Sequence, residues 1–296
     1  MQDNGVLLII DDVQSNAEVL GNILKDEYQI KVALNGQKAL ELSRLKPLPD
    51  LILLDVEMPD MDGFEVLKQL KSNSDTANIP VIFVTGRDAT AQEEKGLLCG
   101  AVDYITKPVR PVIVKARVNT HLTIKYQRDE LVHRATYDQL TNLSNRHHLT
   151  QMGMKIFSQA KRHEQDFCAI IVDIDHFKAI NDNHGHLIGD KVLKSVADIL
   201  NHNKRVEDFL ARYGGEEFII LLSNCNIEDA TFKANILRQR IQGLLPHNIQ
   251  VTASFGIAQL NSSHTTFELL IKDADDALYK AKENGRNRVE AHTIES

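Results

Sequence analysis

The chain has 296 residues, with 34 lysines and arginines against 41 aspartates and glutamates, and a net charge of −7. This length suits about two domains of the usual ~100 to 200 residues, and the acidic balance excludes a global basic field that would hold nucleic acid by counterion release. No apolar stretch approaches the ~18 residues of a membrane span and the three cysteines form no CxxC pair, so we expect a cytoplasmic protein without membrane insertion.

Short apolar runs alternate with helical patterns in the first third of the chain. The expected strands cover residues 6–10, 51–54, 81–84 and 104–105, and the expected helices include residues 15–25 and 36–45. Continuous apolar runs of this length are typical of parallel strands that helices cover on both faces. The pattern therefore predicts an α/β domain.

A polar residue lies at or just beyond the end of each of these strands. Asp11 and Asp12 follow the first, Asp55 the second and Thr85 the third, and Lys107 comes shortly after the last. The carboxyl ends of parallel strands meet at one edge, where open α/β sheets bind their ligands. Three carboxylates there would bind Mg²⁺ and leave Asp55 as a nucleophile toward a phosphoryl donor. The simpler alternative is that these aspartates cap the following helices.

Residues 1–108 resemble the receiver domain of two-component response regulators. The matching features are the aspartate pair, the sequence DVEMPDMDG at residues 55–63, Thr85 and Lys107-Pro108. The resemblance implies a doubly wound five-stranded parallel sheet of the flavodoxin type, and a cognate histidine kinase that phosphorylates Asp55. The metal ligands that it implies for Mg²⁺ or Mn²⁺ are Asp11, Asp12, Asp55 and the carbonyl of Glu57. It also implies a switch in which Thr85 and Lys107 bind the phosphoryl group, Tyr104 follows Thr85, and the face around the fourth helix, fifth strand and fifth helix repacks.

Residues 109–136 have a helical pattern with no glycine, and Pro111 lies where a first helical turn tolerates proline. Apolar residues step by four from Val114 to Tyr126, and Ile124 and Leu131 lie one heptad apart. We expect one long helix that continues the receiver's last helix as a stalk. It would pair with the same stalk of a second subunit in a homodimer or higher homo-oligomer. The alternative is a lone solvated connector.

A hairpin with clustered carboxylates is the main feature of the second half. The sequence FLARYGGEEF at residues 209–218 has two apolar arms around a Gly-Gly pair, which favours a primed turn because glycine reaches positive φ without steric cost. Glu216 and Glu217 are therefore expected at its tip, where an ordinary acidic turn is the alternative. Asp173 ends a buried strand predicted for residues 167–172 and supplies a third carboxylate. Such a cluster stays ionised most readily beside a divalent cation.

Together these features resemble the GGDEF family of diguanylate cyclases, in its GGEEF variant, over residues 137 to about 290. The matching stretches are residues 137–146, 173–190, the hairpin, 251–258 as a strand, and 273–288 as a helix that ends at Asn284-Gly285. The resemblance implies an α+β domain of the nucleotidyl cyclase, palm-like class. It also implies the condensation of two GTP into cyclic di-GMP with release of two pyrophosphates, between two domains that face one another antiparallel.

The resemblance also implies a role for each polar residue of this domain. The implied ligands of Mg²⁺ or Mn²⁺ are Asp173, Glu216 and the carbonyl of Ile174. The implied triphosphate cations are Lys178, Lys282 and Arg286, beside Gly214 and Gly215 of the hairpin. Either Glu216 or Glu217 would take the proton of the attacking 3′-hydroxyl. Each cation taken alone is more simply a solvated surface charge.

Guanine offers N1-H and amino donors beside an O6 acceptor, so a carboxylate plus an amide suits its edge. By resemblance, Asn181 and Asp190 read the guanine, with His186 between them. The residues alone leave another interpretation open. Asn181 and Asp182 could instead cap a turn, and Asp190 could open a helix over residues 191–200.

An RxxD pair, Arg205 and Asp208, precedes the hairpin. By resemblance it is an inhibitory site that grips intercalated dimers of the product, whereas elsewhere it would be a surface i, i+3 pair. The chain departs from the family at Asn142, which stands where glycine is usual, so positive φ is expected there. His176 and His184 replace frequent aromatic residues.

The favoured interpretation is a phosphorylation-regulated diguanylate cyclase with product feedback. It has a receiver domain at residues 1–108, a helical stalk at 109–136 and a cyclase domain at 137–296. The main alternative is a receiver-gated, non-catalytic module that binds GTP or cyclic di-GMP and signals through partner contacts. A response regulator that binds DNA conflicts with the acidic balance and with the lack of a helix-turn-helix pattern.

Overall fold

The computed structural model describes residues 5–86 and 97–292. The chain divides into two compact units, residues 1–131 and 132–296, which are taken in turn below. Within the described ranges, no helix combines the length and the apolar character needed to cross a bilayer.

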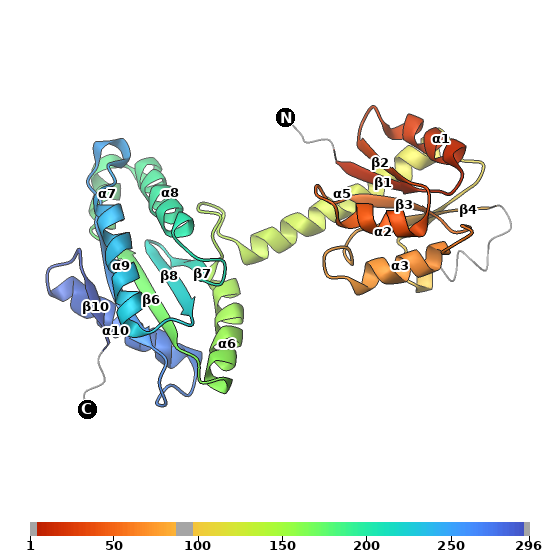
Figure 1. The fold of residues 1–296 in the computed structure, drawn as a ribbon. Helices are drawn as coiled ribbons and strands as arrows, with labels where there is room; N and C mark the ends of the chain where they lie inside the picture. Colours follow the sequence, from red (N-terminus) through yellow and green to blue (C-terminus); the bar gives the residue numbers. More distant parts are fainter. Residues whose placement is uncertain (1–4, 87–96, 293–296) are drawn as a thin grey trace. The chain divides into compact units, whose positions relative to one another are not determined.

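The first unit is a five-stranded parallel sheet in the order β2-β1-β3-β4-β5, with helices on both faces (Figure 1). Its strands are β1 (Val6–Ile10), β2 (Gln29–Ala33), β3 (Leu51–Asp55), β4 (Val81–Thr85) and β5 (Asp103–Thr106). Its helices are α1 (Gln14–Leu24), α2 (Gly36–Arg44), α3 (Gly63–Ser72) and the first part of α5 (Pro111–Thr136). The predicted doubly wound class is confirmed. The fourth helix that the resemblance implies falls between β4 and β5, where residues 87–96 lie outside the described part.

The central strands are apolar on both faces because each face is covered by helices. In β1, Leu7 and Ile9 belong to the core under α1 and α5, while Leu8 and Ile10 belong to the core under α2 and α3. All five residues of β1, β3 and β4 are buried. Polar side chains are therefore left to the strand ends, where the candidate site lies.

The stripe that steps by four along α5 packs on the receiver sheet. Val114, Val118 and Leu122 are buried in the core shared with α1, so this part of the helix is the receiver's own last helix. Ile124 and Leu131 are instead 54% and 67% exposed. This later part of the helix therefore keeps apolar side chains available for contact with a second subunit.

The second unit is an α+β domain around a five-stranded sheet in the order β10-β9-β6-β8-β7, antiparallel except for β10 with β9. Its strands are β6 (Phe167–Ile174), β7 (Phe209–Gly214), β8 (Glu217–Ser223), β9 (Ala253–Gln259) and β10 (Val289–Ala291). Its helices are α6 (Arg146–Arg162), α7 (Phe177–His184), α8 (His186–His202), α9 (Ile227–Gln242), the 3₁₀ turn η1 (Pro246–Asn248) and α10 (Phe267–Glu283). The predicted α+β class is confirmed.

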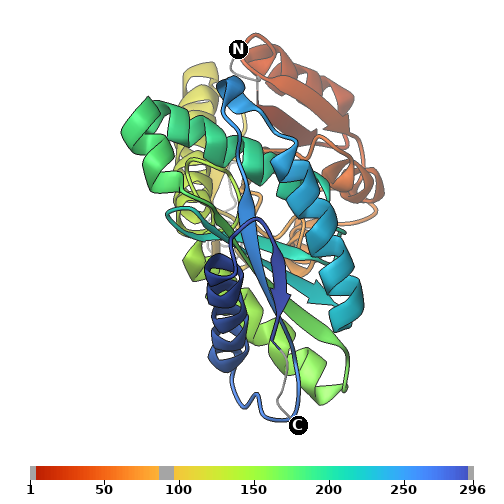
Figure 2. The ribbon, with the colours of Figure 1, turned by 90° about the vertical axis from the view of Figure 1, so that its left-hand side faces the viewer.

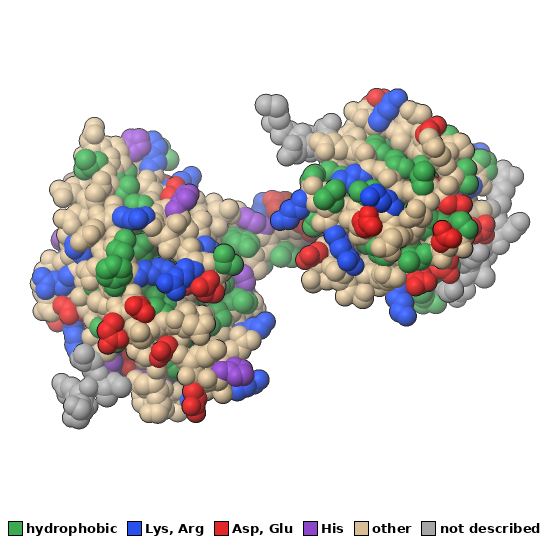
Figure 3. Space-filling view, viewed as in Figure 1, with side chains coloured by type: hydrophobic (Ala, Val, Ile, Leu, Met, Phe, Trp, Pro, Cys, Tyr) green, Lys and Arg blue, Asp and Glu red, His purple; other side chains and the backbone are tan. Residues whose placement is uncertain are grey.

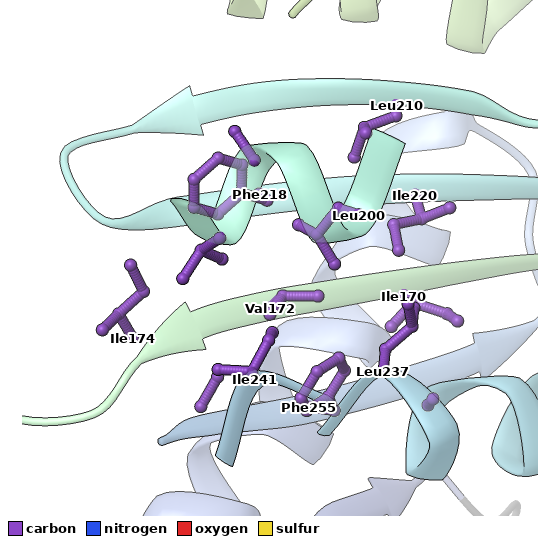
Figure 4. Packing of buried hydrophobic residues seen from close by; sticks show 14 of the residues in the cluster. Ile170, Val172, Ile174, Leu200, Leu210, Phe218, Ile220, Leu237, Ile241 and Phe255 are labelled. Atoms are coloured by element: carbon purple, nitrogen blue, oxygen red, sulfur yellow. The ribbon is translucent and has the colours of Figure 1, made fainter. Parts of the chain in front are cut away.

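Helices cover both faces of this sheet (Figures 1 and 2). On one face, Val172, Phe218 and Phe255 of neighbouring strands pack with Leu200 of α8 and Leu237 of α9 (Figure 4). On the other face α6 and α10 cover the alternate strand residues. Each fully buried side chain of this size stabilises the fold by about 1.5 to 3 kcal/mol.

The last helix differs from its predicted bounds at the start. It begins at Phe267, six residues before the expected Asp273, because Phe267 and Leu270 extend its buried face. It ends at Glu283, and Gly285 has a φ of +112° as expected for a left-handed cap.

Helix α10 approaches β9 so closely that residue 256 must be glycine. A Cβ at Gly256 would lie 2.1 Å from the carbonyl oxygen of Ala274 and 2.2 Å from the amide nitrogen of Leu278. Gly256→Ala is expected to lower the free energy of unfolding by about 1 to 3 kcal/mol, as overpacking does. Urea unfolding measures this change.

Gly243→Ala is the matched control, because its nearest atoms are 3.5 Å away and its φ of −78° suits alanine. Equal stability of the two variants would contradict the close helix-strand contact.

Candidate active site and phosphoacceptor site

Three aspartates converge at the carboxyl edge of the receiver sheet. Asp11 follows β1 and Asp55 ends β3, which are neighbouring strands. Each of Asp11, Asp12 and Asp55 offers a carboxylate oxygen that lies within 4.8 Å of the others. Within residues 5–86 and 97–292 no other group of three or more such side chains meets this distance. Oxygen ligands at this spacing suit a hard divalent cation.

Lys107 lies over the same cluster. Its Nζ is 2.7 Å from Asp55 Oδ2 and 2.9 Å from Asp11 Oδ2. Burial raises the pKa of Asp55, and Lys107 opposes that rise. Burial disfavours the Lys107 ammonium, but its hydrogen bonds to Asp55 and Asp11 outweigh this and raise its pKa. The lysine is thus the resident counter-ion of a buried anionic cluster.

The predicted switch residues line the neighbouring strands. Thr85 is the buried last residue of β4, the strand that pairs with the Asp55 strand β3. Tyr104 lies in β5, the strand on the other side of β4. The guanidinium carbon of Arg117, on α5, is 5.4 Å from the centroid of the Tyr104 ring. The Glu57 amide donates to Asp55 Oδ1 at 3.3 Å, which keeps this loop close to the acid.

The acidic hairpin forms as predicted, but its turn differs from the expected one. Gly214 pairs with Glu217, so the two loop residues are Gly215 and Glu216. Only Gly215 of this turn has a positive φ, of +26°. A primed turn with both glycines at its centre was therefore wrong. The irregular register between Arg212 and Gly214 moves the turn one residue along.

The hairpin brings its glutamates beside the end of β6. Asp173 stands opposite Glu217 in the antiparallel register of β6 and β8, and the Ile174 amide donates to the Glu216 carbonyl at 3.4 Å. Burial, and after it the charge of Asp173, raises the pKa of Glu216 and of Glu217. Burial also raises the pKa of Asp173, against the effect of Lys282. The Asp173 charge therefore disfavours the ionised form of both glutamates.

Cations approach the acids from α10. Lys282 Nζ lies 2.9 Å from Asp173 Oδ2. Arg286 is exposed just beyond the helix end, and its charge reaches Asp173, where it opposes the rise in pKa. Lys178 is exposed in the first turn of α7. Basic and acidic side chains also lie interspersed on the face of the molecule shown in Figure 3.

Helices α7 and α8 carry the residues expected to read a base. Asn181 lies inside α7 and Asp190 inside α8, so the alternative that they cap a turn and open a helix is wrong. Asn181 Oδ1 is one of two buried side-chain polar atoms, among the described residues, without a hydrogen-bond partner. Gly189 makes room for it, because a Cβ there would lie 1.9 Å from Oδ1. His186 is exposed at the start of α8.

The two side chains of the RxxD pair differ in exposure to solvent. Asp208 is buried, accepts a hydrogen bond from the Arg205 amide at 2.8 Å, and forms an ion pair with Lys233 of α9. The Arg205 side chain is exposed. The carboxylate thus fixes the turn that presents the guanidinium to solvent.

Both acidic clusters fit a divalent cation on physical grounds. In the receiver, three carboxylates already lie within ligand distance of one another. In the second unit, burial raises the pKa of both Asp173 and Glu216, and the charge of Asp173 raises that of Glu216 further; a cation between the two carboxylates would relieve both effects. Two carboxylates plus the Ile174 carbonyl leave room for phosphate oxygens.

Two residues of this region escaped the sequence analysis. Arg212 donates from Nη1 to Asp138 at 3.0 and 3.2 Å and from Nη2 to the Gly215 carbonyl at 2.6 Å, so it connects the hairpin turn to the segment after α5. Asp175 is a buried carboxylate two residues after Asp173. Both lie inside quoted motifs, but Asp138 and the hydrogen-bond partners of Asp175 are distant in sequence. Asn142 has the expected positive φ, of 56°.

Comparison with protein families gives two matches. Residues 135–288 match the family "Diguanylate cyclase, GGDEF domain", which is half of the chain. Residues 7–119 match the family "Response regulator receiver domain".

Individual relatives agree with both matches. The response regulator PleD of Caulobacter vibrioides is 33% identical over 96% of this chain. The chain spans 65% of the length of that protein. The coiled coil and GGDEF domain of DgcB from Caulobacter crescentus, solved in complex with c-di-GMP, is 29% identical with a TM-score of 0.54, covering 60% of this chain and 98% of that one. The active GGEEF domain of a diguanylate cyclase from Vibrio cholerae is 37% identical with a TM-score of 0.50, and the match covers 51% of this chain and 99% of that one.

Proposed function

Because the chain belongs to the GGDEF family of diguanylate cyclases and carries a response-regulator receiver domain, we propose that it condenses two GTP into cyclic di-GMP with release of two pyrophosphates. The observation that carries this proposal is the acid cluster at the end of β6. Asp173, paired with Lys282, lies there beside two hairpin glutamates of raised pKa. Such a site suits a metal-bound triphosphate and a proton acceptor.

Nucleotide binding would use the charged side chains of the site and Asn181 Oδ1, the buried acceptor that lacks a hydrogen-bond partner. Asp173, Glu216 and the Ile174 carbonyl would hold Mg²⁺ or Mn²⁺, which when bound neutralises the triphosphate charge. Lys178, Lys282 and Arg286 would bind phosphate oxygens, next to Gly214 and Gly215 at the turn. Asn181 Oδ1 would accept from a guanine donor and Asp190 from another, with His186 beside them.

Proton transfer falls to the hairpin glutamates. A carboxylate whose pKa is raised above its ordinary value is a better proton acceptor near neutral pH than an ordinary surface acid. Burial and the neighbouring Asp173 raise the pKa of both Glu216 and Glu217. One of them would take the proton of the attacking 3′-hydroxyl. Glu217 also lines a cavity of about 560 Å³ with Tyr213, Arg146 and Asp275.

Catalysis would need two copies of the chain. Each cyclase domain has one such site, whereas the product joins two nucleotides, so two domains must face one another. The exposed Ile124 and Leu131 on α5 give the stalk an apolar face for a second subunit. The coiled coil named for the DgcB relative supports this mode of pairing. The functional unit is thus proposed to be a homodimer or higher homo-oligomer.

Phosphorylation of Asp55 by a histidine kinase would control this pairing. The added phosphoryl group would pair with Lys107 and a receiver-bound divalent cation, and Thr85 would hydrogen-bond it. Tyr104 would follow, and its cation–π partner Arg117 is on α5, the helix that continues into the stalk. The contact supplies a physical connection between the phosphoacceptor and the subunit interface.

Product would feed back through Arg205 and Asp208. The exposed guanidinium is planar and suits the guanine edges and phosphates of cyclic di-GMP. The buried Asp208, fixed by Lys233, holds the turn in place. This assignment is independent of the catalytic residues.

Loss of one acid of the cluster should nearly abolish the reaction. Asp173→Asn or Glu216→Gln is expected to lower cyclic di-GMP formation roughly 100-fold or more, because a metal ligand supplies several kcal/mol and each ~1.36 kcal/mol is tenfold in rate. Initial rates by chromatography measure this. Glu228→Gln, an exposed glutamate in the first turn of α9, is the control with unchanged rate. Turnover within about twofold of wild type in an acid variant would refute the assignment.

Beryllofluoride, which mimics the phosphoryl group, should raise the cyclase rate of the wild type but not of Asp55→Asn. The reason is that the mimic requires the Asp55 carboxylate oxygen. Asp60→Asn, in the same loop and exposed, should respond as wild type does. An equal response of wild type and Asp55→Asn would show that Asp55 is not the switch.

Arg205→Ala should weaken the binding of cyclic di-GMP about tenfold or more, because charge-assisted hydrogen bonds contribute roughly 1.5 to 3 kcal/mol. Isothermal titration measures the affinity. Lys204→Ala removes the neighbouring exposed charge and should change it little. The RxxD assignment fails if Arg205→Ala binds as tightly as wild type.

A further inference from the structure

Asp175 is a buried carboxylate that the proposed metal site does not use. It lies directly after β6 and is 4% exposed. Ser254 Oγ donates to Oδ1 at 2.7 Å, Thr252 Oγ1 donates to Oδ2 at 2.7 Å, and the Asn287 amide donates to Oδ2 at 3.0 Å. A buried charge persists when hydrogen bonds satisfy it. Asp175 therefore ties together the end of β6, the start of β9 and the turn after α10.

That turn has an unfavourable backbone conformation. Gly285, Arg286 and Asn287 have φ angles of +112°, +60° and +46° in succession. Positive φ is disfavoured for a residue with a Cβ, so two such residues in a row need contacts that impose it. Asn287 supplies them on two sides. Its amide donates to Asp175, and its Oδ1 accepts from Arg238 Nη1 of α9 at 3.1 Å.

Arg286 is the residue that this turn orients. It stands one residue before the anchored amide, and its own amide donates to the Ala281 carbonyl at 3.0 Å. Its side chain is exposed, and its Nη1 donates to the carbonyl of Lys282 at 3.5 Å, the residue whose ammonium pairs with Asp173. A change of backbone at residues 285–287 would move the guanidinium from its place beside Lys282.

We propose that Asp175 is a positioning residue that holds the 285–287 turn so that Arg286 grips the triphosphate. The inference rests on the proposed function, because Arg286 meets phosphate only if GTP binds here. Asp175 itself does not contact the nucleotide. The hydroxyls of Thr252 and Ser254 fix the carboxylate so that Oδ2 faces Asn287.

The test is the affinity of the full chain for a GTP analogue with a methylene bridge between the α and β phosphorus atoms, measured with Mg²⁺ by isothermal titration. Asp175→Ala and Arg286→Ala should each weaken binding roughly tenfold, and the double variant should be no more than about twofold weaker than either. Asp175→Asn should stay within about threefold of wild type, since its amide oxygen can still accept from Asn287. Asp166→Ala is the matched control. It removes an aspartate at the other end of β6 that accepts from Gln259, and should bind as wild type does.

Several results would overturn the inference. Additive losses in the double variant would mean that Asp175 does not act through Arg286, and equal losses in Asp175→Asn and Asp175→Ala would mean that charge, not hydrogen bonding, matters.

If Asp175→Ala fails to fold, Thr252→Val makes the same test, because it removes the hydroxyl that holds Asp175 Oδ2 toward the Asn287 amide and keeps a side chain of similar size. It should weaken binding about threefold in wild type and not in Arg286→Ala, and equal loss in both backgrounds would refute the proposal. Wild type that does not bind the analogue would overturn the proposed function and this inference together, whereas wild-type affinity in Asp175→Ala overturns the inference alone.

Discussion

The register of β6 against β8 is the constraint on which the second unit depends. It sets Asp173 opposite Glu217 and brings the end of β6 to the hairpin turn. Carboxylates that close repel one another, and burial prevents water from relieving the repulsion. Their pKa values rise, and Lys282 pairs with Asp173. The site is thus assembled by backbone pairing at a cost in electrostatic free energy, which a cation and a triphosphate would offset.

The receiver uses the same arrangement on an unrelated sheet. Asp11 follows and Asp55 ends neighbouring parallel strands, and Lys107 bridges the two carboxylates, whereas Lys282 pairs with Asp173 alone. In both units a lysine neutralises part of the buried charge, and it would be free to pair with phosphate if a metal took the carboxylates. The two sites therefore share one physical principle. Strand pairing brings carboxylates together, and a lysine lowers the electrostatic free energy of keeping them ionised.

Much of this could be predicted from the sequence, because strand ends and hairpin tips are local features. Asp55 at the end of β3 and Glu216 at the turn follow from apolar runs and a Gly-Gly pair. The one-residue shift of the turn could not be predicted, since it depends on the irregular register at Arg212. Nor could the contact of Asn181 with Gly189 or the ties of Asp175, because their partners are brought close only by helix and sheet packing. Likewise, one long helix over residues 109–136 was predictable, but not that Val114, Val118 and Leu122 pack on the receiver sheet while Ile124 and Leu131 stay exposed.

The central claim is that this arrangement of acids and cations makes cyclic di-GMP. The most direct test is to incubate the purified chain with GTP and Mg²⁺ in the presence of beryllofluoride, and to quantify nucleotide products by chromatography and mass together with released pyrophosphate. The account predicts cyclic di-GMP as the product, with pyrophosphate and cyclic di-GMP in a ratio of about two to one, since each of the two bonds formed releases one pyrophosphate. GTP that is bound but returned unchanged, or hydrolysed to GDP and phosphate, would contradict it.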